Sequence, residues 1–299
     1  MHSFQTAIEK GEFVITAEVA PPKGTDTARL IEISKKLSSG PKPRVHAINV
    51  TDSQRAITRM SSVSASALLR QNESEPICQM TCRDRNRIGL QGDLLGAWAL
   101  GVTNILALTG DAVQIGDNRE AKPVFDFDSV KLLRLIEQLN QGINVDQKPL
   151  QGRPSFFAGA AVNPNLPMEA PFKRRFEAKL KAGARFFQSQ PIFDPKKLED
   201  LWQFTHPLGA KILAGVMLLK SVKQANFLNE KVPGVLVSED ALKKLARVAD
   251  PSNPTAELEA GIELAAEQIR NFRGHCDGVH IMTVGAEDRI PEILERAGV

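Results

Sequence analysis

The hydrophobic and polar positions of this chain follow two alternating patterns from one end to the other. Short apolar runs bounded by glycine, proline or polar residues indicate strands, and apolar residues spaced three or four apart indicate helices. We expect strands at residues 13–19, 45–51, 76–81, 104–109, 155–162, 185–190, 211–218 and 278–284. We expect helices at residues 25–37, 61–70, 91–100, 129–139, 172–182, 196–204, 222–229, 238–248, 257–272 and 287–297. Strands that alternate regularly with helices predict an α/β fold.

The strand expected at residues 104–109 helps to decide between the α/β architectures. It is nearly all apolar, as parallel strands covered on both faces are. The first strand is followed by the letters APPKG at residues 20–24, which do not match the glycine fingerprint of doubly wound dinucleotide-binding folds. Eight strands are the number in a closed barrel. We therefore predict a single (β/α)8 TIM barrel with extra C-terminal helices, one domain over residues 1–299, with Asp128 as a helix N-cap and a surface loop at residues 141–154.

Composition and charge narrow the classes of function. The 299 residues are 42% hydrophobic and 24% charged, which is typical of a folded globular protein. The 38 basic and 35 acidic residues give a net charge of +3, which is too balanced to indicate binding to nucleic acid or to a membrane surface. Residues 1–13 lack the apolar stretch of a signal peptide, and no apolar run approaches the length of a membrane span. We expect a cytoplasmic protein.

The three cysteines, Cys78, Cys82 and Cys276, are few and odd in number. That count indicates a reducing compartment and not a disulfide framework. Cys78 and Cys82 are too far apart for a C-x-x-C pair, and no histidine cluster accompanies them. We expect them to be small buried apolar residues, and we expect no metal site.

Polar residues mark the carboxyl ends of the expected strands, which meet on the face where barrel enzymes place their active sites. These residues are Glu18, Thr51, Asp52, Thr81, Thr109, Gly110, Asp111, Asn163, Gln190, Lys220 and Thr283. The ring contains neither a serine or cysteine nucleophile with a partner histidine nor a cluster of metal ligands. None of the five histidines falls clearly at a strand end. We expect His280, in mid-strand, to lie in the core or on the outer face.

Each polar feature has a structural and a functional interpretation. Glu18 is either an outward-facing acid paired with a lysine, or a general acid kept protonated by burial in the barrel mouth. Asp111 either caps a turn or faces a ligand, with Gly110 allowing close approach of the backbone. Gln190 either satisfies backbone groups or binds a heterocycle by paired donor and acceptor contacts. The arginines at positions 83, 85 and 87 most simply form a solvated loop, although they could also meet a phosphate or carboxylate. The residues alone predict a barrel enzyme that binds a polar heterocycle.

Six segments of the chain resemble, in order, those of the 5,10-methylenetetrahydrofolate reductase family. They are AEVAPPKG (residues 17–24), NVTD (49–52), QMTCRD (79–84), NILALTGD (104–111), KLKAGARFFQSQPIFD (179–194) and ILAGVMLLKSVKQ (212–224). The resemblance runs over almost the whole chain, and the last two long segments, at residues 179–194 and 212–224, are specific. The segments RDRNR (83–87) and VFDFDS (124–129) are most similar to the branch that is fused to homocysteine methyltransferases.

The resemblance implies a flavoprotein of one-carbon and methionine metabolism that reduces 5,10-methylenetetrahydrofolate to 5-methyltetrahydrofolate with NAD(P)H. Glu18 would match the general acid that activates the methylene bridge, and Asp111 a carboxylate near both flavin and folate. Folate would contact Gln190, Asp111 and Val222. The flavin, FAD or alternatively FMN, would contact Thr51, Gln79, Thr81, Thr109, Gly110, Asp111, Asn163 and Lys179. The partner of the site would be a small-molecule folate, and the chain could also form a homo-oligomer or bind a redox or methyltransferase protein.

Five positions depart from the family pattern. Gln79 and Asn163 stand where histidine is usual, Thr109 replaces an arginine, Phe172 replaces an aspartate near the flavin tail, and Val222 replaces an aromatic residue. The residues expected to take part in the reaction therefore match the family pattern more closely than the residues expected to contact the flavin tail. This pattern keeps open an alternative, a folate- or flavin-binding subunit that needs a partner protein for its electrons. A Schiff-base lyase would need a lysine at a strand end, where Lys220 is the only candidate.

Overall fold

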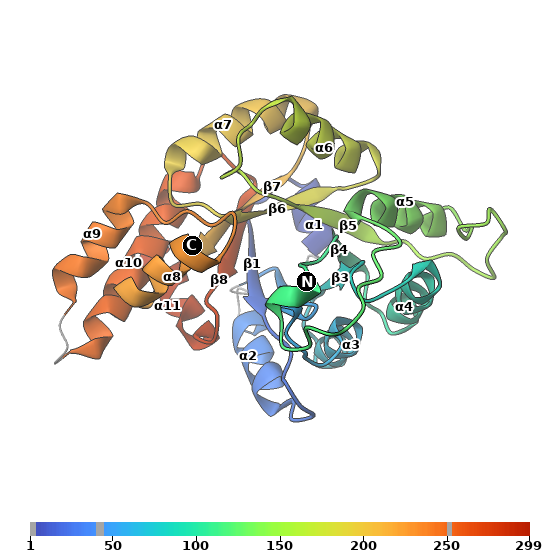
Figure 1. Cartoon of the computed structure of the whole chain (residues 1–299), viewed down its shortest axis with the longest axis horizontal. Coiled ribbons are helices and arrows are strands. Elements are labelled where there is room, and N and C mark those ends of the chain that lie inside the picture. Colours follow the sequence, from blue (N-terminus) through green and yellow to red (C-terminus); the bar gives the residue numbers. More distant parts are fainter. Residues whose placement is uncertain (1–3, 40–44, 250–252) are drawn as a thin grey trace.

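The computed structural model describes residues 4–39, 45–249 and 253–299, and it confirms the predicted barrel (Figure 1). Eight parallel strands pair in sequence order, and the eighth closes the ring by pairing with the first. The strands are β1 (Val14–Val19), β2 (Ala47–Val50), β3 (Pro76–Thr81), β4 (Asn104–Leu108), β5 (Phe157–Val162), β6 (Phe186–Pro191), β7 (Ile212–Met217) and β8 (Gly278–Met282). Each lies within two or three residues of its expected position.

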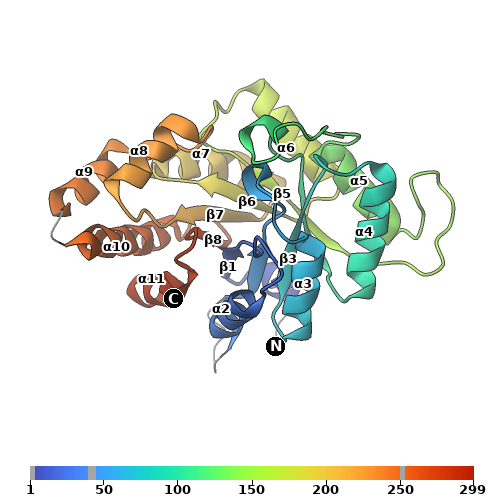
Figure 2. The ribbon, with the colours of Figure 1, turned by 60° about the horizontal axis from the view of Figure 1, so that its bottom comes forward.

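Helices form the outer layer of the barrel (Figures 1 and 2). The first helix is α1 (Phe4–Glu9), and the helices of the outer layer are α2 (Ala28–Ser38), α3 (Ser62–Gln71), α4 (Arg87–Ala99), α5 (Ser129–Asn140), α6 (Ala170–Lys181), α7 (Pro195–Thr205), α8 (Val222–Lys231), α9 (Glu239–Val248), α10 (Pro254–Phe272) and α11 (Ile290–Ala297). The extra helices α9 and α10 follow α8 between β7 and β8, and all three gather on one side of the barrel in both views. No helix among the described residues is both long and apolar enough to cross a bilayer.

Side-chain caps explain two of the helix boundaries. Asp128 accepts a hydrogen bond from the backbone N–H of Lys131, which confirms it as the N-cap of α5. Helix α4 begins four residues earlier than expected because the Asn86 side chain accepts from the N–H groups of Ile88 and Gly89. The expected loop at residues 141–154 contains one isolated antiparallel bridge, between Ile143 and Pro149.

Helix α1 closes the bottom of the barrel, and the apolar pattern gave no sign of it. Its Phe4 is fully buried, and the Phe4 ring packs edge-on against those of Phe186 and Phe157, with centroids 4.9 and 5.8 Å away. Those rings belong to a cluster of inward-facing residues near the starts of the strands. A six-residue helix is shorter than the window over which a helical period can be recognised. Helix α1 therefore acts as a plug at the bottom of the barrel. The opposite end, where the strands finish, is the open mouth.

Candidate active site

A cavity of about 220 Å³, called here the mouth cavity, lies at the carboxyl ends of the strands. It brings together seven of the predicted site residues: Glu18, Gln79, Thr81, Thr109, Gly110, Asp111 and Gln190. They come from β1, β3 and β6 and from the segment that follows β4. Such a convergence of polar groups from separate strands is the usual construction of a barrel active site.

Glu18 faces into the mouth, so its interpretation as an outward-facing acid paired with a lysine is wrong. One carboxylate oxygen accepts from the Gln54 amide at 3.4 Å, and the other from the Gln79 amide at 3.4 Å. The second oxygen also lies 3.7 Å from Nε2 of His280, and the Glu18 side chain is only 11% exposed. The carboxyl group is therefore held in one orientation between two amides and an imidazole.

His280 is a site residue that the sequence interpretation missed. It is buried inside the barrel and does not lie on the outer face. Its Nδ1 lies 3.0 Å from Oγ1 of Thr16, its pair partner across β1 and β8, and 3.4 Å from the amide nitrogen of Gln188. The imidazole thus connects Glu18 to a layer of polar groups inside the barrel. Inward-facing and outward-facing residues alternate along a barrel strand. His280 lies two residues from both Gly278 and Met282, so these three residues share one face of β8. This alternation is a signal that could have placed His280 inside the barrel.

Two of the three arginines after β3, Arg83 and Arg85, are largely buried, which corrects the expectation of a solvated loop for them. The side chain of Arg87 is 52% exposed, in line with that expectation. Arg85 binds Asp52 with both terminal nitrogens, at 2.6 and 3.3 Å, and its Nε binds Asp93 at 2.7 Å. Asp52 also accepts from the Thr81 backbone N–H and hydroxyl, at 2.8 and 2.9 Å. Burial by itself lowers the pKa of Arg85, but the two carboxylates outweigh it and raise that pKa. The charged pair of Arg85 and Asp52 ties the end of β2 to the end of β3.

Arg83 is the second buried arginine of this run, with 2% of its surface exposed, and it lines the mouth cavity. Nε and Nη2 bind the carboxylate of Asp84 at 2.8 and 2.6 Å. Its Cβ explains why position 110 is glycine: a Cβ on Gly110 would lie 2.9 Å from it, and Gly110 has a φ of +97°. The backbone after β4 can therefore lie against β3 only without a side chain at position 110.

Asp111 lies exposed at the rim and holds a strained loop over the mouth. One carboxylate oxygen accepts from the backbone N–H of Arg55 at 2.9 Å. Three residues of this loop that are not glycine, Ser53, Arg55 and Ala56, have φ values of 47°, 56° and 54°, a conformation that is unfavourable for residues with side chains. The Arg55 guanidinium stacks on the Phe227 ring of α8 at 5.5 Å. The loop is thus anchored both to Asp111 and to the far side of the mouth.

A second cavity of about 550 Å³, called here the tail cavity, adjoins the mouth cavity. Ala161 and Gln190 line both, and Asn163, Phe172 and Lys179 line the second. Nζ of Lys179 donates to the Ala161 carbonyl at 2.6 Å. Burial, helped by the charge of Arg175, lowers the pKa of Lys179 to about 8. The tail cavity therefore presents a buried amine beside an apolar and aromatic wall.

Two predicted site residues, Thr51 and Val222, line neither cavity. Thr51 is fully buried just after β2, and its hydroxyl has no hydrogen-bond partner among the described residues. Val222 begins α8, where its backbone N–H donates to Glu257 at 2.6 Å. Lys220 donates to the Val284 carbonyl at 2.8 Å on the rim. The three cysteines are buried, as expected, and burial raises the pKa of the Cys78 thiol to about 11.

The sequence matches that of known proteins along its whole length. Residues 3–298 match the family described as "Methylenetetrahydrofolate reductase". "Methylenetetrahydrofolate reductase 2" of Schizosaccharomyces pombe is 22% identical over 326 aligned residues, which cover 98% of this chain and 46% of that protein. The chain therefore spans about half the length of that relative.

A solved structure has the same fold. It is that of an uncharacterized protein from Clostridium thermocellum that binds two copies of 5-methyl-5,6,7,8-tetrahydrofolic acid. The TM-score is 0.64 at 14% sequence identity, and the match covers 98% of this chain and 97% of the other. At that identity the likeness concerns the fold alone.

Proposed function

This chain belongs to the methylenetetrahydrofolate reductase family, and from that premise we propose that it reduces 5,10-methylenetetrahydrofolate to 5-methyltetrahydrofolate. Electrons would come from NAD(P)H through a bound flavin, in the cytoplasm, and the product would supply methyl groups for methionine synthesis. The observation that carries the proposal is the position of Glu18, which faces into the mouth and shares one cavity with Asp111 and Gln190.

Glu18 is the group that would protonate the substrate. The methylene bridge joins two folate nitrogens, and a proton on one of them lets its bond to the bridge open to an iminium, which can accept a hydride. A carboxyl group within hydrogen-bond reach of that nitrogen suits the step. The side-chain amides of Gln54 and Gln79 donate to the Glu18 carboxylate and orient it. Nε2 of His280 lies 3.7 Å from the same carboxylate, and Nδ1 of that imidazole contacts the hydroxyl of Thr16. These neighbours hold the proton donor in place between turnovers.

Gln190 and Asp111 would bind the pterin ring of the folate. A pterin edge presents N–H donors beside a carbonyl acceptor. The Gln190 amide offers one donor and one acceptor, and the Asp111 carboxylate offers acceptors only. Asp111 now accepts from Arg55, so a pterin that binds Asp111 must displace the strained loop at residues 53–56 or share the carboxylate with it.

The two adjoining cavities fit a flavin. Gly110, Thr81 and Gln79 would hold its ring in the mouth cavity, where the glycine lets the backbone approach closely. Lys179 would meet its phosphate in the tail cavity, because a buried amine that faces a cavity suits an anionic group. The flavin, FAD by default and FMN as the alternative, supplies hydride transfer when bound.

The direct test combines cofactor identification with turnover. The purified chain should show a flavin absorption spectrum, and mass measurement of the extracted cofactor should give FAD or FMN. Anaerobic oxidation of NADH or NADPH should then depend on methylenetetrahydrofolate and yield 5-methyltetrahydrofolate. A colourless protein that oxidises neither donor in the presence of folate and added flavin would refute the proposal.

A second candidate is a folate- or flavin-binding subunit that receives its electrons from a partner protein. One observation favours it: Phe172 gives the tail cavity an apolar wall where the family pattern has an aspartate. This candidate predicts a bound flavin that dithionite reduces and NAD(P)H does not. Rapid reduction by NADH or NADPH alone would exclude it.

A further inference from the structure

The loop at residues 53–57, called here the mouth loop, is fixed at both of its ends. It follows Asp52, which the two terminal nitrogens of Arg85 bind at the end of β2. It leads to Thr58, whose backbone N–H and hydroxyl donate to the Asp117 carboxylate at 3.0 and 3.1 Å. A loop that is held at both ends moves as a flap about those ends, as enzyme lids do.

Individually weak contacts hold the middle of the mouth loop across the barrel opening. The Gln54 amide donates to the Glu18 carboxylate at 3.4 Å, which is a long hydrogen bond. The backbone N–H of Arg55 donates to Asp111 at 2.9 Å in an exposed position. The Arg55 guanidinium lies 5.5 Å from the centroid of the exposed Phe227 ring on α8. Solvent competes for contacts of these kinds, so the middle of the loop can leave its place at a low free-energy cost.

The position of the mouth loop in this structure also stores backbone strain. Ser53, Arg55 and Ala56 have φ values of 47°, 56° and 54°, which cost free energy in residues that carry a Cβ. The same position brings the Ala56 carbonyl so close to Gly116 that a Cβ on Gly116 would lie 1.9 Å from the carbonyl oxygen. Movement of the loop away from Gly116 would let the three φ angles relax.

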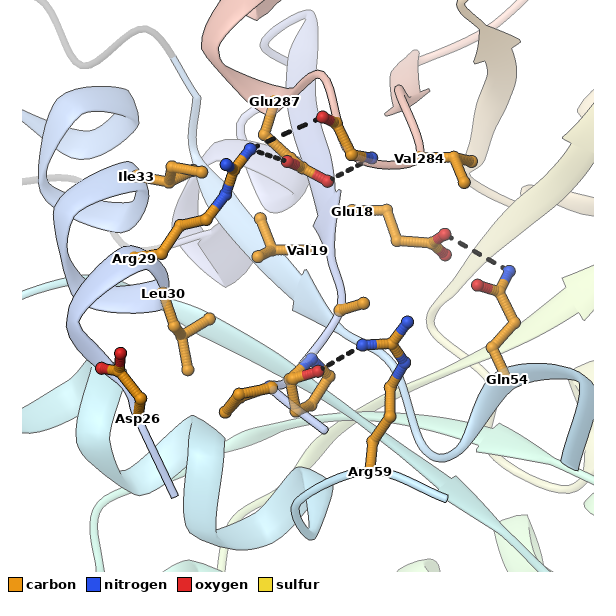
Figure 3. Close-up of a pocket in the computed structure, with 14 residues that line it drawn as sticks. Glu18, Val19, Asp26, Arg29, Leu30, Ile33, Gln54, Arg59, Val284 and Glu287 are labelled. Carbon is orange, nitrogen blue, oxygen red and sulfur yellow. Dashed lines mark hydrogen bonds and ion pairs between the residues drawn. The ribbon is translucent and has the colours of Figure 1, made fainter. Parts of the chain in front are cut away.

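The mouth loop separates two cavities, and Gln54 is the residue at their boundary. A third cavity of about 460 Å³, called here the flank cavity, opens beside Glu18 on the β1 and β8 side of the mouth. Gln54 and Glu18 line both it and the mouth cavity, and Figure 3 shows the hydrogen bond between their side chains. The mouth cavity, at about 220 Å³, is smaller than the roughly 300–1,000 Å³ that is usual for ligand sites. Withdrawal of Gln54 would join the two cavities into one space of the usual size.

We propose that the mouth loop is a lid, closed in this structure, that the ligand itself opens. A ligand N–H that binds Asp111 displaces the N–H of Arg55 and so removes the shortest contact in the middle of the loop. The loop then moves away from Gly116 and takes Gln54 off Glu18, which frees one oxygen of that carboxylate for the substrate. The proposal rests on the proposed function for the identity of the ligand, a pterin. It adds a coupling between binding at Asp111 and access to Glu18.

Gly116→Ala tests the lid without any ligand. The three atoms nearest to its added Cβ all belong to Ala56, so the substitution acts against the closed position. Hydrogen exchange at the Arg55 amide should become about tenfold or more faster than in the wild type. Phe227→Leu, which removes the cation–π contact, should accelerate it about two- to fivefold. The matched control is Gly92→Ala on the exposed face of α4, where an added Cβ meets nothing within 4 Å outside its own helix in the described part of the chain; it should leave the rate unchanged.

Addition of 5-methyltetrahydrofolate to the wild-type protein gives a second measurement. A ligand that binds beneath a fixed loop slows hydrogen exchange in that loop. A ligand that opens the lid should instead accelerate exchange at the Arg55 amide by about tenfold, as expected for the loss of a hydrogen bond to a charged group. The amide of Thr58 should exchange at an unchanged rate, because its bond to Asp117 belongs to the fixed end of the loop.

Slower exchange at Arg55 in the folate-bound wild type would overturn the lid, and so would equal exchange in Gly116→Ala and the wild type. If circular dichroism shows that Gly116→Ala is unfolded, the measurements on the wild type and on Phe227→Leu decide in its place. A protein that binds no folate, but whose Gly116→Ala variant exchanges faster at Arg55, would refute the proposed function and leave the lid standing. The failures of the two proposals are therefore distinguishable.

Discussion

Replacement of Lys179 by methionine should stabilise the ligand-free protein at neutral pH. Burial lowers the pKa of this amine from 10.5 to about 8. A shift of that size corresponds to roughly 3 kcal/mol by which the buried charge destabilises the folded state. The substitution also removes the hydrogen bond to the Ala161 carbonyl, a loss of about 1 kcal/mol. The net gain in the free energy of unfolding at pH 7 is therefore about 2 kcal/mol.

The sign of the pH dependence follows from the lowered pKa. Below pH 8 the folded and unfolded chains both carry the proton on Lys179, and the folded state bears the full penalty. Between about pH 8 and pH 10.5 the folded protein releases this proton before the unfolded chain does. The unfolded state then binds more protons, so the contribution of Lys179 to stability becomes more favourable as pH rises. The advantage of Lys179→Met should shrink through this window.

Urea unfolding at pH 7 and at pH 9.5 measures the effect. Lys181→Met serves as the matched control, because Lys181 lies on the same helix with 81% of its side chain exposed. The difference between wild type and Lys179→Met should fall from pH 7 to pH 9.5, while the control stays within about 0.5 kcal/mol of the wild type at both. A Lys179→Met variant that is less stable at pH 7, or whose difference from wild type does not change with pH, would show that Lys179 is not a desolvated cation.

Three further substitutions test the plug, the buried ion pair and the close approach at the rim. Phe4→Ala removes the buried ring by which α1 packs into the bottom of the barrel, and it should lower the free energy of unfolding, measured in urea, by about 3–5 kcal/mol; a loss under 1 kcal/mol would show that α1 is not part of the core. Arg85→Met leaves Asp52 buried without its cation and should lower the free energy of unfolding by a similar amount, about 3–5 kcal/mol at pH 7; a loss under 1 kcal/mol would count against the pair. Gly110→Ala places a Cβ 2.9 Å from that of Arg83 and should weaken flavin binding, measured by fluorescence titration, by about tenfold or more; unchanged affinity would place the cofactor elsewhere.

The strands could be expected from the sequence because they depend on local patterns, whereas the pattern left open whether Glu18 faces into the barrel. The sequence of β4 is almost continuously apolar because one face of the strand lies against the barrel interior and the other against the helical layer. The polar residues at strand ends are brought together by the topology alone. Seven of the predicted site residues consequently meet in the mouth cavity.

The features that escaped prediction depend on contacts between distant parts of the chain. Arg85 looks solvated in its own segment and becomes buried only because Asp52, 33 residues away, lies beside it. Thr16 and His280 are 264 residues apart and become neighbours when β8 pairs with β1. The predicted barrel makes β8 the neighbour of β1, but no local pattern of charge or hydropathy encodes the register in which the two strands pair.

The role of Glu18 is tested most directly by following the two half-reactions of the Glu18→Gln variant separately by stopped-flow absorbance. Reduction of the bound flavin by NAD(P)H should remain within about twofold of wild type, because no proton from Glu18 is needed there. Transfer to methylenetetrahydrofolate should fall by about 10² to 10⁴, the usual contribution of a general acid. An equal loss in both half-reactions, or an undiminished rate of folate reduction, would contradict the assignment of Glu18 as the proton donor.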